Sequence, residues 1–328
     1  MTTVGIGIVS WNTADLLDRC LTSLPAALGD LDASVVVVDN ASTDDSADIA
    51  ARHAAVTVLR NPINEGYARA MNRALTAGDH QAANVLVALN PDTEPPPGSL
   101  ALLADRLLAA PDVGLVVPRL VYPEGRLQHS AYRFPSVKLA AVVCFVPRRF
   151  QRGRLGRRWW LEGFAPHDRP ADVDWAIGAV HVLRRRALRG ERPYSERWFM
   201  YVEDLDLCWR LARRGWRRRL EADIAIPHVG NASGAQAWGE TRTARWTAAS
   251  YDWYALARGR LAMRAWAAVN TVGVLVHIAA GAFRFRARAR ARELRGVLRV
   301  HLRALWAGPP SPDITTIPPD GTGRRDRS

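Results

Sequence analysis

The chain has 328 residues, enough to bury one large or two medium domains, and its 48% apolar and 23% charged residues are typical of a globular protein. Its net charge of +13 is unusual and predicts an anionic partner: nucleic acid, an acidic lipid surface or phosphorylated substrates. The three cysteines, at positions 20, 144 and 208, support neither a disulfide framework nor a zinc site, which suits a reducing compartment. The first 17 residues lack the basic start and long apolar core of a signal peptide, so we expect the protein to face the cytoplasm.

The first 117 residues alternate short apolar runs with segments of helical spacing. The runs are rich in β-branched residues and end at polar or proline-containing turns, which predicts buried strands. Leucine spacing predicts helices over Ala14–Leu24 and Leu100–Leu108, and a further helix starts within residues 64–72 and closes at Gly78. This alternation predicts a largely parallel sheet covered by helices on both faces. The predicted strands are Val4–Val9, Ser34–Val38, Val56–Leu59, Val85–Leu89 and Val113–Val117.

Polar loops follow each of the first four predicted strands. In an α/β sheet such loops gather on one edge, where ligands bind. The four loops carry hydroxyl, amide and carboxylate groups and no positive charge until Arg69, a pattern that suits the base and ribose of a nucleotide. A glycine-rich phosphate loop is absent, which argues against a phosphate-loop NTPase or a nicotinamide enzyme. The loops are Ser-Trp-Asn (10–12), Asp-Asn-Ala-Ser-Thr-Asp (39–44), Asn-Pro-Ile-Asn-Glu-Gly (61–66) and Asn-Pro-Asp (90–92).

The segment Val85–Glu94 forms the centre of this arrangement. Pro91 cannot donate to a sheet ladder, so the strand must end there and a turn must begin. Asp92, just past the strand, is placed to hold a hard divalent cation and present it to a diphosphate. The alternative is that Asn-Pro-Asp is only a favourable turn.

A second group of chemical residues lies in the second half of the chain. Trp175 and Gly178 precede a predicted strand, Val180–Leu183, and Gly178 fits either a close approach of the backbone to a ligand or a plain turn. From Asp204 the pattern is helical, ending before Gly215, and three acids stand at its start, where helix capping is the alternative explanation. A short predicted strand, 224–226, leads to a histidine at position 228 that is otherwise an ordinary loop residue.

Two further segments are basic and aromatic or apolar. Residues 147–160 interleave arginines with aromatic rings and form either a solvated basic loop or a surface that meets lipid headgroups or nucleic acid. Ala265–Phe283 is close to the ~20 apolar residues that span a bilayer, and eight arginines follow it. We expect a helix that lies in the membrane interface, with a core helix packed on the catalytic domain as the alternative.

Taken in order, six stretches of the chain resemble the family 2 glycosyltransferases with a GT-A fold, in particular bacterial rhamnosyltransferase-like members. The resemblance covers roughly residues 4–234 and implies a Rossmann-like, nucleotide-binding mixed sheet flanked by helices. The stretches are VSWN (9–12), VDNASTDDS (38–46), NEGYARAMNRA (64–74), LNPDTE (89–94), WFMYVEDLDLCWRL (198–211) and HVGNASG (228–234).

The resemblance also implies roles for single residues. In the nucleotide-sugar site, Asp39 would bind the pyrimidine base. The family's metal motif is commonly Asp-x-Asp, and here Asn90 stands at its first position, which leaves one fewer anionic ligand for the metal. Mn²⁺ or Mg²⁺ would be held by Asp92, completed by His228, whose imidazole favours manganese. The remaining residues assigned to the nucleotide-sugar site are Ser10, Asn12, Asn64, Gly66 and Arg69.

For the chemistry, the resemblance assigns Asp204 as the general base, with Glu203 beside it as a second catalytic carboxyl. An ordinary aspartate is a weak base, so burial or Glu203 should raise its pKa. Trp175 and Gly178 are assigned to acceptor binding. The implied reaction is a metal-dependent, inverting transfer in cell-envelope glycan synthesis.

The expected domains are a GT-A unit over 1–240, with halves 1–117 for the donor and 118–240 for the acceptor, a basic helical amphipathic extension over 241–307 that associates with the membrane, and a disordered tail over 308–328. The expected donor is dTDP-rhamnose, with UDP-galactofuranose or a UDP-hexose as alternatives, and the expected acceptor is a saccharide or a polyprenyl-diphosphate-linked sugar. We expect an anionic membrane surface as a partner and the inner face of the plasma membrane as the location. Nucleic-acid binding is the competing explanation of the charge, but no motif supports it. A non-catalytic nucleotide-sugar-binding relative is the third hypothesis.

Overall fold

The computed structural model describes residues 3–165, 167–230, 242–281 and 288–309, and its contacts divide the chain into two compact units. The first unit contains Met1–Arg133, Ala165–Glu196 and Glu203–Ser233; the second contains Phe134–Phe164, Arg197–Val202 and Gly234–Ser328. This grouping differs from the expected boundary at residue 240, because residues 134–164 and 197–202 belong with the C-terminal helices. The tail expected from residue 308 lies, from 310 onward, outside the described residues.

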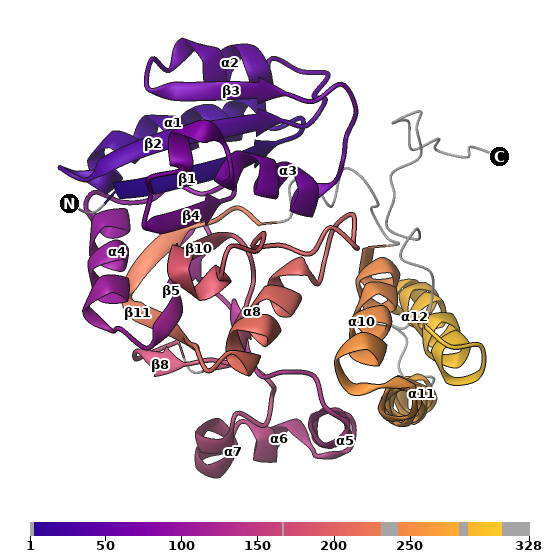
Figure 1. The fold of residues 1–328 in the computed structure, drawn as a ribbon. Helices are drawn as coiled ribbons and strands as arrows, with labels where there is room; N and C mark the ends of the chain where they lie inside the picture. The colour runs from indigo at the N-terminus through magenta and orange to yellow at the C-terminus, as the bar shows by residue number, and fades with distance from the viewer. Residues whose placement is uncertain (1–2, 166, 231–241, 282–287, 310–328) are drawn as a thin grey trace. The chain divides into compact units, whose positions relative to one another are not determined.

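The first unit is built on a nine-stranded mixed sheet of order β3-β2-β1-β4-β10-β5-β11-β8, with β6 beside β5 (Figure 1). The strands β3, β2, β1 and β4 are parallel, as the sequence predicts. The strand β10 lies antiparallel between β4 and β5, which confirms the mixed sheet that the resemblance implies. The strands are β1 (Thr3–Ser10), β2 (Asp32–Asp39), β3 (Val56–Arg60), β4 (Val85–Leu89), β5 (Val113–Val121), β6 (Leu127–Gln128), β8 (Ala171–Asp172), β10 (Val180–Arg184) and β11 (Arg217–Pro227).

Helices of the first unit cover the sheet, and two of them start or end elsewhere than predicted. The helix expected to start within residues 64–72 does so, at Tyr67, but ends at Leu75 and not at Gly78, and the first helix continues past Leu24 to Leu28. A short helix after β2 had no clear sequence signal. The helices are α1 (Ala14–Leu28), α2 (Ser46–Arg52), α3 (Tyr67–Leu75), α4 (Ser99–Ala109) and α8 (Glu203–Arg213), and a separate two-stranded sheet pairs β7 (Ala131–Tyr132) with β9 (Trp175–Ala176).

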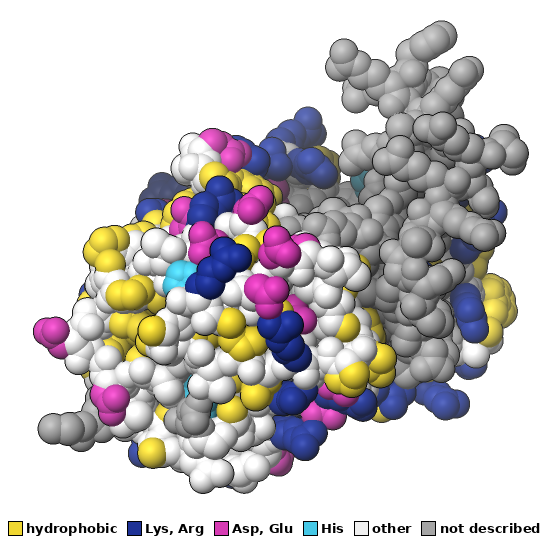
Figure 2. Space-filling view, turned by 90° about the horizontal axis from the view of Figure 1, so that it is seen from above, with side chains coloured by type: hydrophobic (Ala, Val, Ile, Leu, Met, Phe, Trp, Pro, Cys, Tyr) yellow, Lys and Arg dark blue, Asp and Glu magenta, His cyan; other side chains and the backbone are white. Residues whose placement is uncertain are grey.

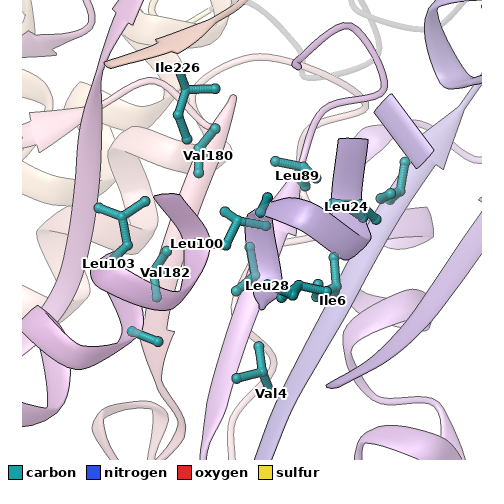
Figure 3. Close-up of a cluster of buried hydrophobic side chains, with 14 of the residues drawn as sticks. Val4, Ile6, Leu24, Leu28, Leu89, Leu100, Leu103, Val180, Val182 and Ile226 are labelled. Carbon is teal, nitrogen blue, oxygen red and sulfur yellow. The ribbon is translucent and has the colours of Figure 1, made fainter. Parts of the chain in front are cut away.

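The main core of the first unit lies between α1, α4 and one face of the sheet. Leu24 and Leu28 of α1 and Leu100 and Leu103 of α4 point toward strand residues such as Ile6 (Figure 3). Each of these side chains is buried, and full burial of one large aliphatic group contributes about 1.5–3 kcal/mol. Burial of the strands explains why they are continuous apolar runs in the sequence. Each strand ends where a polar loop begins.

The second unit is helical in its described part. The segment 147–160, for which a basic loop was one expectation, folds into two short helices. The helix α11 packs against α5, α10 and α12. By length and composition alone, residues Arg260–Ala279 of α11 are long and apolar enough to cross a membrane, and 22% of that apolar window is buried in the protein. The helices are α5 (Val137–Phe145), α6 (Arg148–Gln151), α7 (Arg154–Trp159), α10 (Arg242–Arg258), α11 (Arg260–Gly281) and α12 (Arg288–Trp306).

Asp252 on α10 is the polar anchor of the second unit. Its buried carboxylate accepts hydrogen bonds from Arg197 Nε at 2.6 Å and Nη2 at 2.9 Å, and from Trp198 Nε1 at 3.0 Å. A charge-assisted bidentate pair of this kind is stronger than a neutral hydrogen bond. It ties the segment 197–202 to α10.

We expect Asp252→Ala to lower the free energy of unfolding by about 1–3 kcal/mol, because the buried Trp198 N–H would lose its acceptor. Chemical denaturation of the full chain measures this change. The matched control is Asp223→Ala, which removes an exposed ion pair with Arg106 and should cost less than about 1 kcal/mol. Equal losses in the two variants would contradict the anchoring role.

Candidate active site

The antiparallel strand β10 explains why distant residues meet at one edge of the sheet. The carboxyl ends of β1, β2, β4 and β11 all point to this edge, and β10 starts there because it runs the opposite way. The Asn90 N–H donates to the Ala179 carbonyl at 2.9 Å, which places Gly178 next to the end of β4. This is the edge at which α/β sheets bind ligands.

Asp39 closes β2 with a carboxylate that is only partly used. The side chain is 5% exposed; Oδ2 accepts from Ser42 N at 3.3 Å, and Oδ1 is buried with no hydrogen-bond partner among the described residues. A buried unpartnered acceptor is costly unless a ligand donates to it. The geometry therefore fits an oxygen that receives an N–H from a nucleotide base.

Ser10 and Asn12 hold the neighbouring loops together. The buried Ser10 hydroxyl shares a hydrogen bond of 2.8 Å with the Thr13 hydroxyl. Asn12 has φ 53°, which asparagine tolerates better than most residues, and its Oδ1 accepts from Thr43 N at 2.7 Å. Direct contact of either side chain with a nucleotide stays a prediction.

Asn64 and Gly66 belong to an amide network that the sequence reading only partly identified. Asn64 Oδ1 accepts from Gly66 N at 3.0 Å and from Asn40 Nδ2 at 2.8 Å, and the almost fully buried Asn40 accepts in turn from Asn61 Nδ2 at 2.8 Å. This network explains why α3 begins only at Tyr67. Asn40 had no signal beyond its place in the Asp-Asn loop.

Arg69 lies on the first turns of α3. Its side chain is more than half exposed and its Nε is 3.5 Å from Glu196 Oε2. An exposed pair of this kind is weak, so the guanidinium is available to an anionic ligand. Its contact with a diphosphate stays a prediction.

Asp92 and His228 meet where β4 and β11 end. An isolated bridge joins Thr93 to His228, Asp92 Oδ2 accepts from Gly230 N at 3.0 Å, and Asp92 Oδ1 lies 3.2 Å from His228 Nε2. The other ring nitrogen, Nδ1, lies 2.7 Å from Gln128 Oε1 and donates to it. In the neutral ring, Nε2 is then an acceptor that faces a carboxylate, and no donor reaches it within the described part of the chain.

Two buried acceptors facing each other fit a cation placed between them. One carboxylate oxygen and one imidazole nitrogen are ligands that Mn²⁺ accepts, and Gln128 orients the ring as the outer partner of a metal-bound histidine does. No group of three His, Cys, Asp or Glu side chains capable of holding a metal occurs in the described residues, which agrees with Asn90 standing where the family commonly has an aspartate. Gln128 was missed because a lone glutamine 100 residues away carries no pattern.

The helix α8 begins with the buried carboxyl group of Glu203 and the partly buried carboxyl group of Asp204. The two residues before it, Tyr201 and Val202, have φ of 76° and 63°, left-handed conformations that are strained, above all for the β-branched valine. Burial raises the pKa of Asp204 to about 6. Burial, and then the charge of Asp204, raise the pKa of Glu203 well above its usual value. Both carboxyl groups therefore hold a proton more tightly than an exposed acid does.

Backbone groups hold Asp204 in place. Its Oδ2 accepts from Gly178 N at 3.2 Å and its Oδ1 from Leu205 N at 2.7 Å. These bonds favour the ionised form and limit the rise caused by burial. A carboxylate with a fixed orientation and a pKa near neutrality has the properties of a general base.

Tyr67 connects the two carboxyl centres. Its hydroxyl donates to the Gly178 carbonyl at 3.2 Å. Burial, followed by the charges of Glu203, Asp204 and Asp92, raises the pKa of Tyr67 well above its usual value. Gly178 thus contacts both Tyr67 and Asp204, and the neighbouring Ala179 pairs with Asn90, which brings the end of β4 and the start of α8 together.

His181 and Tyr194 support the same stretch of backbone. The His181 Nε2–H donates to the Ala176 carbonyl at 3.1 Å, and its Nδ1 accepts from the Tyr194 hydroxyl at 3.0 Å. Burial lowers the pKa of His181 to about 4, so the ring stays neutral. The carbonyls of Ala176 and Gly178 are both held by side chains that the sequence reading did not single out.

Trp175, which the resemblance assigns to acceptor binding, lies in the short strand β9. Its ring is buried and stacks on Tyr132 with centroids 4.7 Å apart, and Nε1 donates to the Arg133 carbonyl at 3.0 Å. Its indole therefore stabilises the small β7–β9 sheet. Contact with an acceptor stays a prediction.

The mixed sheet, the nucleotide-side loops and the two carboxyl centres define a GT-A glycosyltransferase fold. Residues 6–169 match the model of glycosyl transferase family 2, and the chain belongs to this family. Two solved structures share the fold. A mannosyltransferase from Pyrobaculum calidifontis in complex with GDP-Man and Mn²⁺ aligns with a TM-score of 0.55 and 18% identity over 93% of this chain and 87% of that one. GalNAc-T7 with UDP, GalNAc and Mn²⁺ aligns with a TM-score of 0.50 and 13% identity over 75% and 50%.

Curated relatives come from Mycobacterium tuberculosis. An N-acetylglucosaminyl-diphospho-decaprenol L-rhamnosyltransferase is 31% identical over 217 residues, which cover 63% of this chain and 70% of the relative. A pre-mycofactocin glycosyltransferase is 30% identical over 220 residues, which cover 66% of this chain and 40% of the relative. These similarities support a glycosyltransferase activity for the chain.

Two glycines of the site should respond differently to substitution. Gly66 has φ 82° and ψ 167°, a conformation reserved for glycine, so Gly66→Ala should cost about 1–3 kcal/mol of stability. At Gly178 an added Cβ would lie 3.7 Å from both Asp204 Cβ and the Tyr67 hydroxyl, an ordinary contact, so Gly178→Ala should change stability by less than about 1 kcal/mol. Denaturation curves of both variants measure this difference; a loss at Gly178 as large as at Gly66 would contradict the geometry.

Proposed function

We propose that the protein is an inverting glycosyltransferase that moves a sugar from a nucleotide-sugar donor to a hydroxyl of a lipid-linked saccharide, with Asp204 as the general base. One observation carries the proposal. The partly buried carboxylate of Asp204, with a pKa of about 6, is oriented by the Gly178 N–H, and the next carbonyl, that of Ala179, accepts from the Asn90 N–H at the end of β4. Asp92, two residues after Asn90, lies beside His228. The proposed base, Asp204, and the proposed metal ligands, Asp92 and His228, thus belong to the edge of the sheet at which α/β proteins bind ligands.

In the proposed step, Asp204 takes the proton of the acceptor hydroxyl as its oxygen bonds to the anomeric carbon of the donor sugar. The bond between that carbon and the nucleotide diphosphate breaks in the same displacement, and the diphosphate leaves with the bonding electrons. A single displacement inverts the anomeric configuration. The Gly178 N–H orients the Asp204 carboxylate for this step, while burial, and then the charge of Asp204, raise the pKa of Glu203 beside it well above its usual value.

On the donor side, the free oxygen of Asp39 would accept from the base, and Arg69 would approach the diphosphate. Asp92 and His228 would hold Mn²⁺ or Mg²⁺, which offsets the charge that develops on the leaving diphosphate. With only one carboxylate ligand, the donor's own phosphate oxygens have to complete the coordination. We propose dTDP-rhamnose as donor because the rhamnosyltransferase of M. tuberculosis is 31% identical over 217 residues; UDP-galactofuranose and UDP-hexoses are the alternatives.

On the acceptor side, we propose a sugar linked to a polyprenyl diphosphate, since the name of the same relative specifies a decaprenol-linked substrate. Gly178 contacts both Asp204 and Tyr67, and an acceptor hydroxyl would approach Asp204 beside this glycine. Such an acceptor resides in a membrane, so we place the enzyme at the cytoplasmic face of the plasma membrane, where it contributes to cell-envelope glycan synthesis. A non-catalytic nucleotide-sugar-binding role is the second candidate, favoured by Asn90 in the metal motif.

Asp204→Asn should lower turnover by about 10²–10⁴-fold, because the amide cannot take the proton. Nucleotide release from the donor measures turnover, and donor-induced thermal stabilisation should be retained. In the unmodified chain, kcat/KM should fall about tenfold for each pH unit below about 6, since protonation removes the base. Turnover of Asp204→Asn close to that of the unmodified chain would remove Asp204 as base, and no turnover in either would favour the binding role.

UDP or dTDP together with Mn²⁺ should raise the Tm of the unmodified chain more than the nucleotide alone, because the cation joins the diphosphate to Asp92 and His228. In Asp92→Asn this additional shift should be lost. Asp223→Asn, an exposed carboxylate on β11, serves as the matched control and should keep it. A Mn²⁺-dependent shift that persists in Asp92→Asn would show that the cation binds elsewhere.

A further inference from the structure

Positive charge is divided unequally between the two units. The first unit contains 21 arginines and lysines against 25 acidic residues, whereas the second contains 24 against 7. Figure 2 views the molecule from the side of α2 and β3, where acidic and basic side chains intermingle on the first unit. The basic character of the whole chain therefore resides in the second unit.

Exposed apolar side chains are concentrated in the same unit. Among the described residues, 16 large hydrophobic side chains are exposed, and 13 of them belong to the second unit. Scattered exposed hydrophobics are normal, but this concentration is not. The 13 are Val143, Phe145, Phe150, Leu155, Trp159, Trp246, Leu256, Leu261, Val272, Leu275, Val276, Leu302 and Trp306.

On α11 the exposed residues form a stripe at helical spacing. Leu261, Val272, Leu275 and Val276 lie on one side of the helix, and Leu261 is 83% exposed. The opposite side of α11 contains buried residues such as Met263, and α11 packs against α5, α10 and α12. The helix therefore has one partnered face and one apolar face without a partner in the described unit.

On α12 the exposed stripe is basic and carries an aromatic end. Arg295, Arg299, Leu302, Arg303 and Trp306 share one face, since they are spaced by four, three, one and three residues. On the opposite face of α12, His301 and Ala304 are buried. Arginine beside tryptophan is the side-chain pair found at membrane interfaces.

The helices α6 and α7 also expose apolar and aromatic side chains among arginines. Phe150, Leu155 and Trp159 are 58%, 72% and 58% exposed and stand among exposed arginines, one of which, Arg149, lies 4.9 Å from the Phe150 ring. Gln151 fixes α6 to α5 by donating to the Val146 carbonyl at 2.6 Å. In Figure 1, α7, α6, α5 and α11 follow one another along the lower edge of the view, and α5 contacts α11.

We propose that the exposed stripes of α11 and α12, together with α6 and α7, form a docking surface for an anionic phospholipid bilayer. The apolar stripe would enter the acyl boundary while the arginines contact the headgroups, as in interfacial amphipathic helices. The proposal deepens the proposed function, since it names the surface that brings the enzyme to a lipid-linked acceptor. It does not depend on the chemistry at Asp204.

Charge decides between a bilayer and the other possible occupants. A second copy of the chain would bring two strongly basic surfaces together, which Coulomb repulsion opposes. A nucleic acid would neutralise the arginines but would not cover the aliphatic stripe of α11. Only an anionic lipid surface matches both the arginines and the apolar residues.

The helix α11 lies along this surface and does not cross the membrane. Its packing on α5, α10 and α12 would have to be broken for it to span, and α10 carries the buried Asp252 pair with Arg197. Arg260 and Arg264 stand on the first turns of α11, within the length that spanning would require.

Flotation of the full chain with vesicles tests the proposal. The unmodified chain should float with vesicles that contain phosphatidylglycerol and fail to float with pure phosphatidylcholine, and high salt should weaken the binding. The variant Arg299→Glu/Arg303→Glu should lower the bound-to-free ratio by at least about tenfold, from the electrostatic attraction expected per arginine. Its matched control, Arg52→Glu/Arg106→Glu on the first unit, should bind like the unmodified chain.

The variant Leu261→Ser/Leu275→Ser tests the apolar stripe, with Ile63→Ser/Leu102→Ser as its control from the first unit. We expect only the α11 variant to lose flotation. Failure of the unmodified chain to float, or equal loss in variant and control, would overturn the proposal. So would a dimer seen by light scattering that the α11 variant dissociates while its flotation stays unchanged. The assay contains no donor or acceptor, so its failure is distinguishable from a failure of the proposed chemistry.

Discussion

The antiparallel placement of β10 between β4 and β5 is the constraint on which the site depends. Strands that run parallel bring only their carboxyl ends to the binding edge. A strand inserted in the opposite direction adds its beginning, and here that beginning is Gly178 and Ala179. The Gly178 N–H then reaches the carboxylate of Asp204, while the neighbouring N–H of Asn90 pairs with Ala179. One reversed strand thus joins the carboxylate of Asp204 to the loop of Asp92.

Burial and hydrogen bonding act against each other at Asp204, and their balance is what makes the residue suitable as a base. Burial alone would favour a neutral acid, whereas two backbone N–H groups favour the ionised form, and the resulting pKa is about 6. At Glu203, one residue earlier, burial and the charge of Asp204 raise the pKa well above its usual value, against a single backbone hydrogen bond from its own N–H. At the other centre, Gln128 accepts from Nδ1 of His228, and the other ring nitrogen lies 3.2 Å from Asp92 Oδ1.

The sequence predicted most of what has local periodicity or an ordered motif. The four parallel strands, the family and the carboxylates at 39, 92 and 204 follow from apolar runs and from six stretches in order. The direction of β10 could not be predicted, because a short apolar run has the same pattern in a parallel and in an antiparallel strand. Asn40, Gln128 and His181 were missed for a related reason: each acts through a partner that is distant in sequence, and a single polar residue gives no pattern. The helices within residues 148–159 were not predicted, because the many arginines of this segment left no clear helical pattern of apolar residues.

The segment 197–202 fixes how the chain enters α8. Arg197 and Trp198 are hydrogen-bonded to Asp252 on α10, and after the four residues 199–202 the chain enters α8 at Glu203. Two of these four residues, Tyr201 and Val202, occupy left-handed conformations, which side chains other than glycine rarely adopt. The backbone that leads to Glu203 and Asp204 is therefore anchored at its beginning and has little conformational freedom at its end.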